Sequence, residues 1–97
     1  MSEITFTRTS IRPSVNTAWF QTPQSVLDHI NSTYRMRDGD LLKTEVMLSD
    51  DKLTMSLINT WRTADAHAAC LADPVIAANI AAMDAYNSQH NIQVILG

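Results

Sequence analysis

The chain has 97 residues, which is enough for one domain and too few for two separate hydrophobic cores. Its formal net charge is −3 and its seven Lys and Arg residues are scattered, so no basic stripe is present that could follow a nucleic-acid backbone. Apolar residues make up 45% of the chain, and Gly and Pro are scarce, which argues against a disordered protein. We therefore expect a single domain, residues 1–97, that does not bind nucleic acid.

The cysteine content and the N-terminal residues bear on location. Cys70 is the only cysteine, so a disulfide within the chain is excluded, which fits a reducing compartment. The first residues, MSEITFTRTS, alternate polar and apolar types and lack the hydrophobic region of a signal peptide. No apolar run approaches the roughly 20 residues that span a bilayer. These features predict a cytoplasmic protein without a membrane partner.

The first predicted element is a strand. Residues 3–11, EITFTRTSI, alternate with a period of two, with Ile4, Phe6 and Arg8 on one side and threonines on the other. Arg8 could reach a carboxylate if it points inward, whereas at an exposed strand edge it would carry no meaning for function. The connection at residues 12–21 is too long for a tight turn.

The second predicted element is a helix over residues 22–39, TPQSVLDHINSTYRMRDG. Thr22 suits the N-cap and Pro23 the first helical position. Gly39 suits the left-handed residue that follows a last turn. The apolar residues recur at helical spacing, which predicts one buried stripe formed by Val26, Leu27, Ile30 and Tyr34.

Residues 41–61, LLKTEVMLSDDKLTMSLINTW, predict a β-hairpin. Two apolar-rich runs flank the polar stretch SDDK at residues 49–52, a composition typical of a turn. On the second strand, Asn59 and Trp61 share one face with Leu57, and hydroxyl side chains share the other face with Ile58.

The last third predicts a broken helix and a short strand. Thr63 can cap a helix over residues 64–72, and the pair Asp73-Pro74 restarts a helix that continues to about Ser88. Residues 91–96, NIQVIL, predict a final strand. The order β-α-β-β-α-β predicts an α+β, ferredoxin-like fold, in which helices cover one face of a four-stranded antiparallel sheet.

A further pattern begins at the end of the second hairpin strand. The strand ends in tryptophan, and a small polar residue, an acidic residue with alanine and then Asp-Pro follow it. This pattern is carried by Trp61, Thr63, Asp65, Ala66, Asp73 and Pro74. This segment resembles the dimeric α/β-barrel superfamily, which includes antibiotic-biosynthesis-monooxygenase-like and stress-responsive barrel proteins. The resemblance implies a homodimer whose two sheets face one another, with the helices outside. A sheet with helices on one face needs a cover or a polar surface on the other, which is compatible with this assembly.

The haem-degrading branch of that superfamily can be compared residue by residue. It places a tryptophan where Cys70 stands and the haem-ligating histidine where Ile80 stands. Because both are absent, the resemblance implies neither haem degradation nor another cofactor.

His67 and Cys70 lie three residues apart on a predicted helix, so their side chains can meet. A neighbouring imidazolium would make the thiol reactive. In the alternative interpretation, the alanine-rich face packs on the sheet and Cys70 acts as a small hydrophobic residue. The second interpretation is favoured, since no third residue is found to orient His67. His29, His67 and His90 lack metal-ligand spacing, so no metal site is predicted.

A candidate ligand pocket emerges if Asn59 and Trp61 face the helices. Its residues are Asn59, Trp61, His67, Tyr34, Tyr86 and Trp19. Aromatic residues serve equally in a core, whereas a buried amide such as Asn59 demands polar partners. The sequence thus predicts a non-catalytic module that binds a small apolar or aromatic ligand or a partner. As the alternative, the resemblance implies a cofactor-independent monooxygenase acting on a small aromatic or polyketide-like substrate. No residue is assigned a catalytic role.

Overall fold

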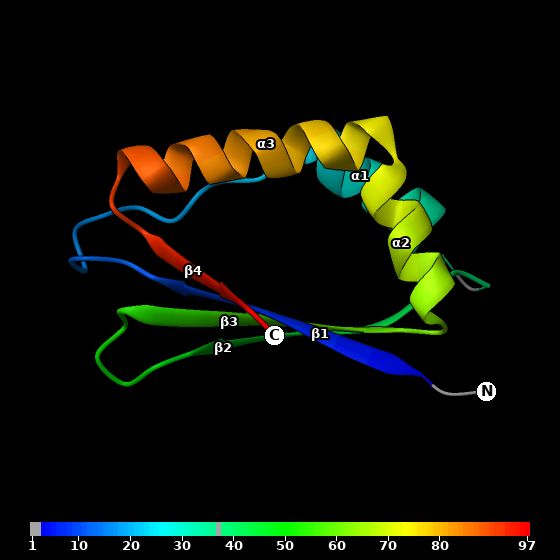
Figure 1. The fold of residues 1–97 in the computed structure, drawn as a ribbon, viewed down its shortest axis with the longest axis horizontal. Helices are drawn as coiled ribbons and strands as arrows, with labels where there is room; N and C mark the ends of the chain where they lie inside the picture. The colour runs from blue at the N-terminus through cyan, green and yellow to red at the C-terminus, as the bar shows by residue number, and fades with distance from the viewer. Residues whose placement is uncertain (1–2, 37) are drawn as a thin grey trace.

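The computed structural model describes residues 3–36 and 38–97; residues 1, 2 and 37, which the sequence placed before the first strand and late in the first helix, lie outside the described part. In chain order its elements are β1 (Ile4–Ile11), α1 (Gln24–Thr33), β2 (Leu41–Leu48), β3 (Thr54–Trp61), α2 (Ala64–Ala72), α3 (Pro74–Gln89) and β4 (Gln93–Leu96). The strands form one antiparallel sheet in the order β2-β3-β1-β4. The helices lie on one face of this sheet (Figure 1). The predicted ferredoxin-like α+β fold is confirmed.

The strand register fixes which side chains face the helices. Phe6 lies opposite Asn59, and Trp61 lies opposite Ile4 on one side and Leu41 on the other. Because Trp61 belongs to the core beneath the helices, every second residue of β3 and its partner on β1 face the helices with it. Arg8, opposite Leu57, lies on this face, and its guanidinium pairs with the Asp84 carboxylate of α3 at 2.8 Å. The predicted alternation in β1 and β3 is therefore confirmed.

The core lies at the end of the sheet that α1 and α2 cover (Figure 1). Its centre is Trp61, which is 4% exposed and packs with Val26 of α1, Leu41 of β2, Cys70 of α2 and Ile76 of α3. At the opposite end, the β2–β3 hairpin carries exposed apolar residues. The position of Trp61 at a strand end thus gathers all three helices around one side chain.

The predicted ends of the first helix are wrong. Pro23, and not Thr22, is the N-cap residue of α1, and it makes no side-chain cap bond. The helix ends at Thr33, well before Gly39, and Gly39 does not adopt a positive φ. The glycine is needed for space, because a Cβ built there would collide with the backbone carbonyl of Tyr34.

The predicted break between α2 and α3 is confirmed. The Thr63 hydroxyl accepts a hydrogen bond from the Ala66 N–H at 3.1 Å, and an Asp73 carboxylate oxygen accepts one from the Val75 N–H at 2.9 Å. The two helix axes meet at 77°. Within the described residues, no single helix has the length and apolar character needed to cross a membrane. α2 and α3 meet these two criteria only when they are taken together as a bent pair.

Candidate functional site

Aromatic side chains from several elements meet around Trp61. The Tyr34 ring, just after α1, lies edge-on at 5.8 Å between centroids, and the His67 ring of α2 lies at 5.5 Å. His67 also stacks on Phe6 of β1, with centroids 3.8 Å apart. The structure therefore brings Trp61, His67 and Tyr34 together. The indole N–H of Trp61 is buried and has no hydrogen-bond partner among residues 3–36 and 38–97, which is uncommon for a buried donor.

The pKa shifts of the two groups considered for nucleophilic chemistry, His67 and Cys70, oppose an imidazolium–thiolate pair. Burial lowers the pKa of His67, which favours the neutral imidazole. Burial raises the pKa of the Cys70 thiol, so that it stays protonated. Cys70 is 7% exposed and belongs to the core cluster. These observations support the interpretation of Cys70 as a packing residue.

Asp73 joins α1 to the α2–α3 corner. One of its carboxylate oxygens accepts a hydrogen bond from the Tyr34 hydroxyl at 2.6 Å and lies 2.7 Å from Nε2 of His29. The hydrogen bonds from His29 and Tyr34 lower the pKa of Asp73 to about 2. Desolvation and the bond to Asp73 raise the pKa of Tyr34, so its phenol remains a donor. The sequence identified Asp73 only as a helix cap, because nothing in the spacing links it to His29.

Asn59 begins a chain of polar side chains that crosses β2. The Thr44 hydroxyl donates to Oδ1 of Asn59 at 2.9 Å and accepts from the Arg35 guanidinium at 2.8 Å. Arg35 also donates to the Asn31 side chain at 3.3 Å. The demand of Asn59 for polar partners is met here, by residues that the sequence did not single out. The strand register, which pairs Thr44 with Asn59, is the signal that would have found them.

Tyr86 and Trp19 form a second group along the connection between β1 and α1. The Tyr86 hydroxyl, from the C-terminal half of α3, donates to the Ala18 carbonyl at 2.6 Å, and its ring packs against Phe20. The Arg12 guanidinium lies 4.5 Å from the centre of the Trp19 ring. The six candidate pocket residues are thus distributed over three clusters: around Trp61, around Asn59, and along this connection.

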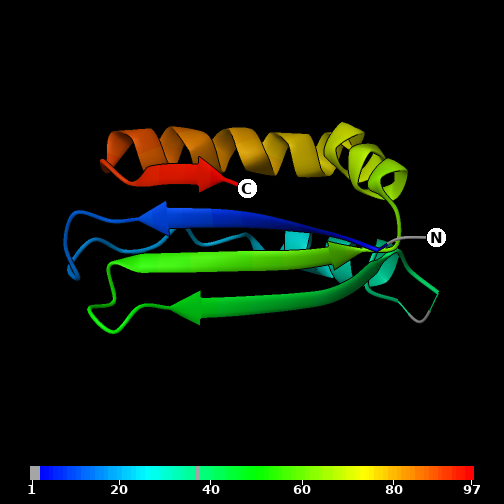
Figure 2. The same ribbon diagram turned by 60° about the horizontal axis from the view of Figure 1, so that its bottom comes forward.

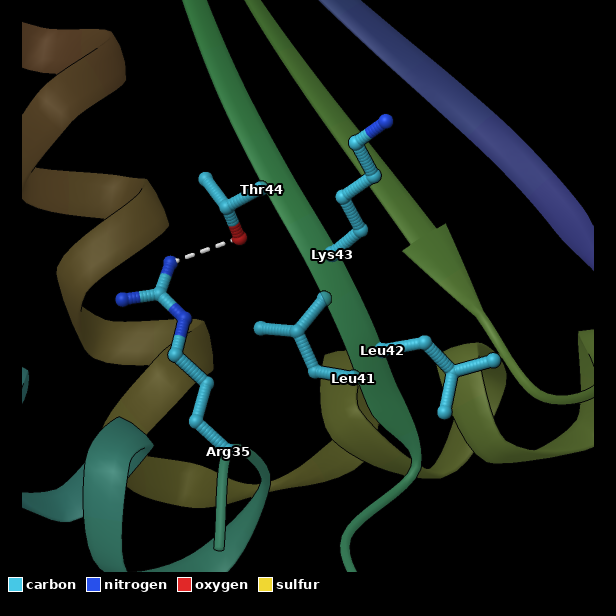
Figure 3. A pocket seen from close by; sticks show the side chains of 5 residues that line it. All are labelled: Arg35, Leu41, Leu42, Lys43 and Thr44. Carbon is cyan, nitrogen blue, oxygen red and sulfur yellow. Dashed lines mark hydrogen bonds between the residues drawn. The ribbon is translucent and has the colours of Figure 1, made fainter.

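Two cavities accompany these clusters. One has a volume of about 170 Å³ and lies at the start of β2 (Figure 3), lined by Arg35, Leu41, Leu42, Lys43 and Thr44. The other, of about 380 Å³, is lined by Asn16, Thr17, Ala18, Tyr86 and His90. The first adjoins the Asn59 chain through Thr44. In the described part of the chain, His, Cys, Asp and Glu form no group of three or more that could hold a metal ion.

Comparison with known proteins points to a structural relationship. No protein-family model and no curated protein matches the chain. A solved structure described as a "putative antibiotic biosynthesis monooxygenase" from Deinococcus radiodurans does match, with a TM-score of 0.59 and 18% sequence identity, over 97% of this chain and 88% of that one. At this identity the likeness establishes the fold. The chain is therefore a ferredoxin-like α+β domain that shares its fold with this solved structure.

Proposed function

We propose that the protein is a small-ligand-binding module built as a dimeric α/β barrel. The observation that carries this proposal is the hydrogen-bonded chain from Asn59 through Thr44 to Arg35, which adjoins a cavity of about 170 Å³. Ligand sites generally combine apolar walls with a few placed polar groups. Leu41 and Leu42 supply the walls of this cavity, while Thr44 and Arg35 supply the polar groups.

Trp61 provides the aromatic neighbour of this site. Leu41, which lines the cavity, lies opposite Trp61 in the register and packs in the same core. The buried indole N–H of Trp61 lacks a partner within the described residues. A small apolar or aromatic compound with one hydrogen-bonding group fits this combination. The cavity lies below the range of about 300–1,000 Å³ usual for drug-sized ligands, so the ligand is small.

The dimer rests on exposed apolar residues at both edges of the sheet. Val46, Met47 and Leu48 on β2 are 62%, 60% and 49% exposed, and Ile95 and Leu96 on β4 are 50% and 72% exposed. Figure 2 shows β2 and β4 as the two outer strands. Apolar edge strands favour association with another chain. A second copy that packs sheet to sheet would cover the face opposite the helices, where Met47 and Ile95 lie, whereas Val46, Leu48 and Leu96 share the face of Trp61 and Arg8.

Native mass spectrometry of protein purified gently from its host tests this proposal. We expect the mass of two chains plus a reproducible additional compound, and we expect Asn59→Leu to lose that compound. The matched control is Asn16→Leu, which makes the same change at an exposed position beside the larger cavity. A dimer without any compound would contradict ligand binding, and loss from the control alone would place the ligand at the larger cavity.

The second candidate function is a cofactor-independent monooxygenase that acts on a small aromatic or polyketide-like substrate. It is favoured by the fold, which is shared with a protein described as a monooxygenase, and by the grouping of Tyr34, His67 and Trp61. Oxygen uptake with such substrates, without added cofactor, tests it. Uptake that disappears in Trp61→Phe would support the enzyme; oxygen consumption no faster than in the protein-free reaction would reject it.

A further inference from the structure

A first feature of this site is the positive charge of Arg35 within the described part of the chain. Among residues 3–36 and 38–97, its guanidinium forms no salt bridge, although acidic residues lie nearby in the sequence. The Asp40 carboxylate pairs with Arg62 at 3.3 Å, and the Glu45 carboxylate pairs with Lys43 at 3.2 Å. Asp40 and Glu45 are therefore engaged with other cations, and none of the described acidic residues lines the cavity beside Arg35.

The guanidinium is also held in place. One terminal nitrogen donates to Thr44 at 2.8 Å and the other donates to Asn31 at 3.3 Å, while Thr44 is itself fixed by its bond to Asn59. Figure 3 shows Arg35 reaching towards Thr44 at the cavity, with the Lys43 side chain directed away from them. An arginine held by neutral partners keeps its charge unneutralised and loses little conformational entropy when it binds an anion.

The strand beside Arg35 is an irregular edge strand. β2 is an edge strand, so that part of its N–H groups lack a strand partner. A register shift between Leu41 and Lys43 interrupts its pairing with β3 at the cavity, and such a bulge leaves a residue unpaired in the ladder. The Leu41 N–H is taken by the Tyr34 carbonyl at 3.0 Å, so the Arg35 guanidinium is the main donor at this cavity, where the side chain of Leu41 lies on the same side of β2 as Arg35 and Thr44 (Figure 3).

We propose that this site binds the carboxylate of a small organic acid, with Arg35 as the contacting residue and with Thr44 and Asn59 as positioning residues. The proposal rests on the proposed function and names the chemical class of its ligand. Carboxylate is favoured because the planar guanidinium fork matches its two oxygens. The side chain of Leu41, on the same side of β2 as Arg35 and Thr44 (Figure 3), would receive the hydrocarbon part of the acid.

Isothermal titration calorimetry with benzoate and its neutral analogue benzamide tests the proposal. We expect benzoate to bind the native protein at least about tenfold more tightly than benzamide, because hydrogen bonds to a charged group are the stronger ones. Arg35→Gln should reduce this ratio to near unity. Thr44→Val should lower the ratio of the two affinities while benzamide still binds. A merely structural defect would instead weaken the binding of both compounds. Circular dichroism would verify that each variant is folded.

The control is Lys52→Gln, which removes one positive charge on the distant hairpin turn and should keep the native ratio. Equal loss in Arg35→Gln and Lys52→Gln would overturn the proposal, because general electrostatic attraction would then explain binding. Inorganic phosphate that binds as tightly as benzoate would overturn the assignment to a carboxylate.

The outcomes separate this proposal from the proposed function. If benzoate and benzamide bind equally and both depend on Asn59, the carboxylate assignment fails while ligand binding stands. If neither probe binds, the chemical nature of the compound that copurifies with the protein decides whether the carboxylate assignment stands. An organic acid that is lost from Arg35→Gln supports the proposal, and a neutral compound overturns it. A protein that carries no compound and binds neither probe overturns both.

Discussion

At the scale of single residues, Asp73 makes contacts beyond those of a helix cap. One carboxylate oxygen caps α3 through the Val75 N–H, and the other contacts His29 and Tyr34. Asp73 therefore links the end of α1 to the corner between α2 and α3. Because these contacts favour the charged carboxylate, the pKa of Asp73 falls to about 2.

This lowered pKa predicts a specific loss of stability in acid. The folded protein holds Asp73 ionised with a pKa of about 2, whereas an unfolded aspartate titrates near about 4. The stabilisation is thus fully present above about pH 4 and is lost as the pH falls towards 2. Urea unfolding of the wild type and of Asp73→Asn, measured from pH 7 to pH 2.5, should show a smaller acid loss in the variant.

The control for that comparison is Asp50→Asn, at the exposed hairpin turn, which should follow the wild-type profile. If Asp73→Asn also follows it, Asp73 does not supply the acid sensitivity.

At this scale, only part of the candidate site could be predicted from the sequence. A period of two placed Asn59 and Trp61 on one face of β3, and the register confirms that this face meets the helices. The partners of Asn59 were missed because Thr44 is fifteen residues distant and Arg35 follows a helix. Local periodicity carries no information on which residues of two strands lie opposite one another. Hydrogen-bond chains between elements need that register.

At the scale of elements, helix boundaries were predicted where a side chain supplies the signal. Thr63 and Asp73 both accept a backbone N–H, and α2 and α3 begin directly after them. α1 begins after Pro23 without a side-chain cap, so the capping rule identified the wrong residue. Its end was also misjudged, because Gly39 was interpreted as a left-handed residue although its role is to allow close approach to Tyr34.

The connection between α1 and β2 therefore gives a prediction of its own. Gly39→Ala should destabilise the protein by about 1–3 kcal/mol, since the new methyl group meets the backbone carbonyl of Tyr34 and forces the backbone to shift. The same movement should displace the preceding Arg35. Gly97→Ala is the control, because nothing lies within 4 Å of a Cβ at that position. Equal free energies of unfolding for the two variants would show that the close approach is unimportant.

At the scale of the whole molecule, the fold leaves one face of the sheet without helices. That face carries mainly hydroxyl side chains from β1 and β3, together with Ile58 and with Met47 of β2. In the single chain Met47 is 60% exposed. The proposed dimer would cover this face, an arrangement that the family resemblance implies only in outline. The pattern of β2 and β3 gives the residues of the face but not the partner that packs against them.

Met47→Lys is the sharpest test of that assembly. If a second sheet packs on the outer face, the lysine places an unpaired charge in the interface, and the dissociation constant of the dimer should rise at least about tenfold. Val15→Lys is the control, because Val15 is similarly exposed, at 55%, but lies in the connection before α1. Light scattering across a dilution series compares the two. A monomeric wild type, or equal dimer affinities in both variants, would contradict sheet-to-sheet packing through Met47. The outcome therefore decides whether the ligand site belongs to one chain alone or to a barrel of two.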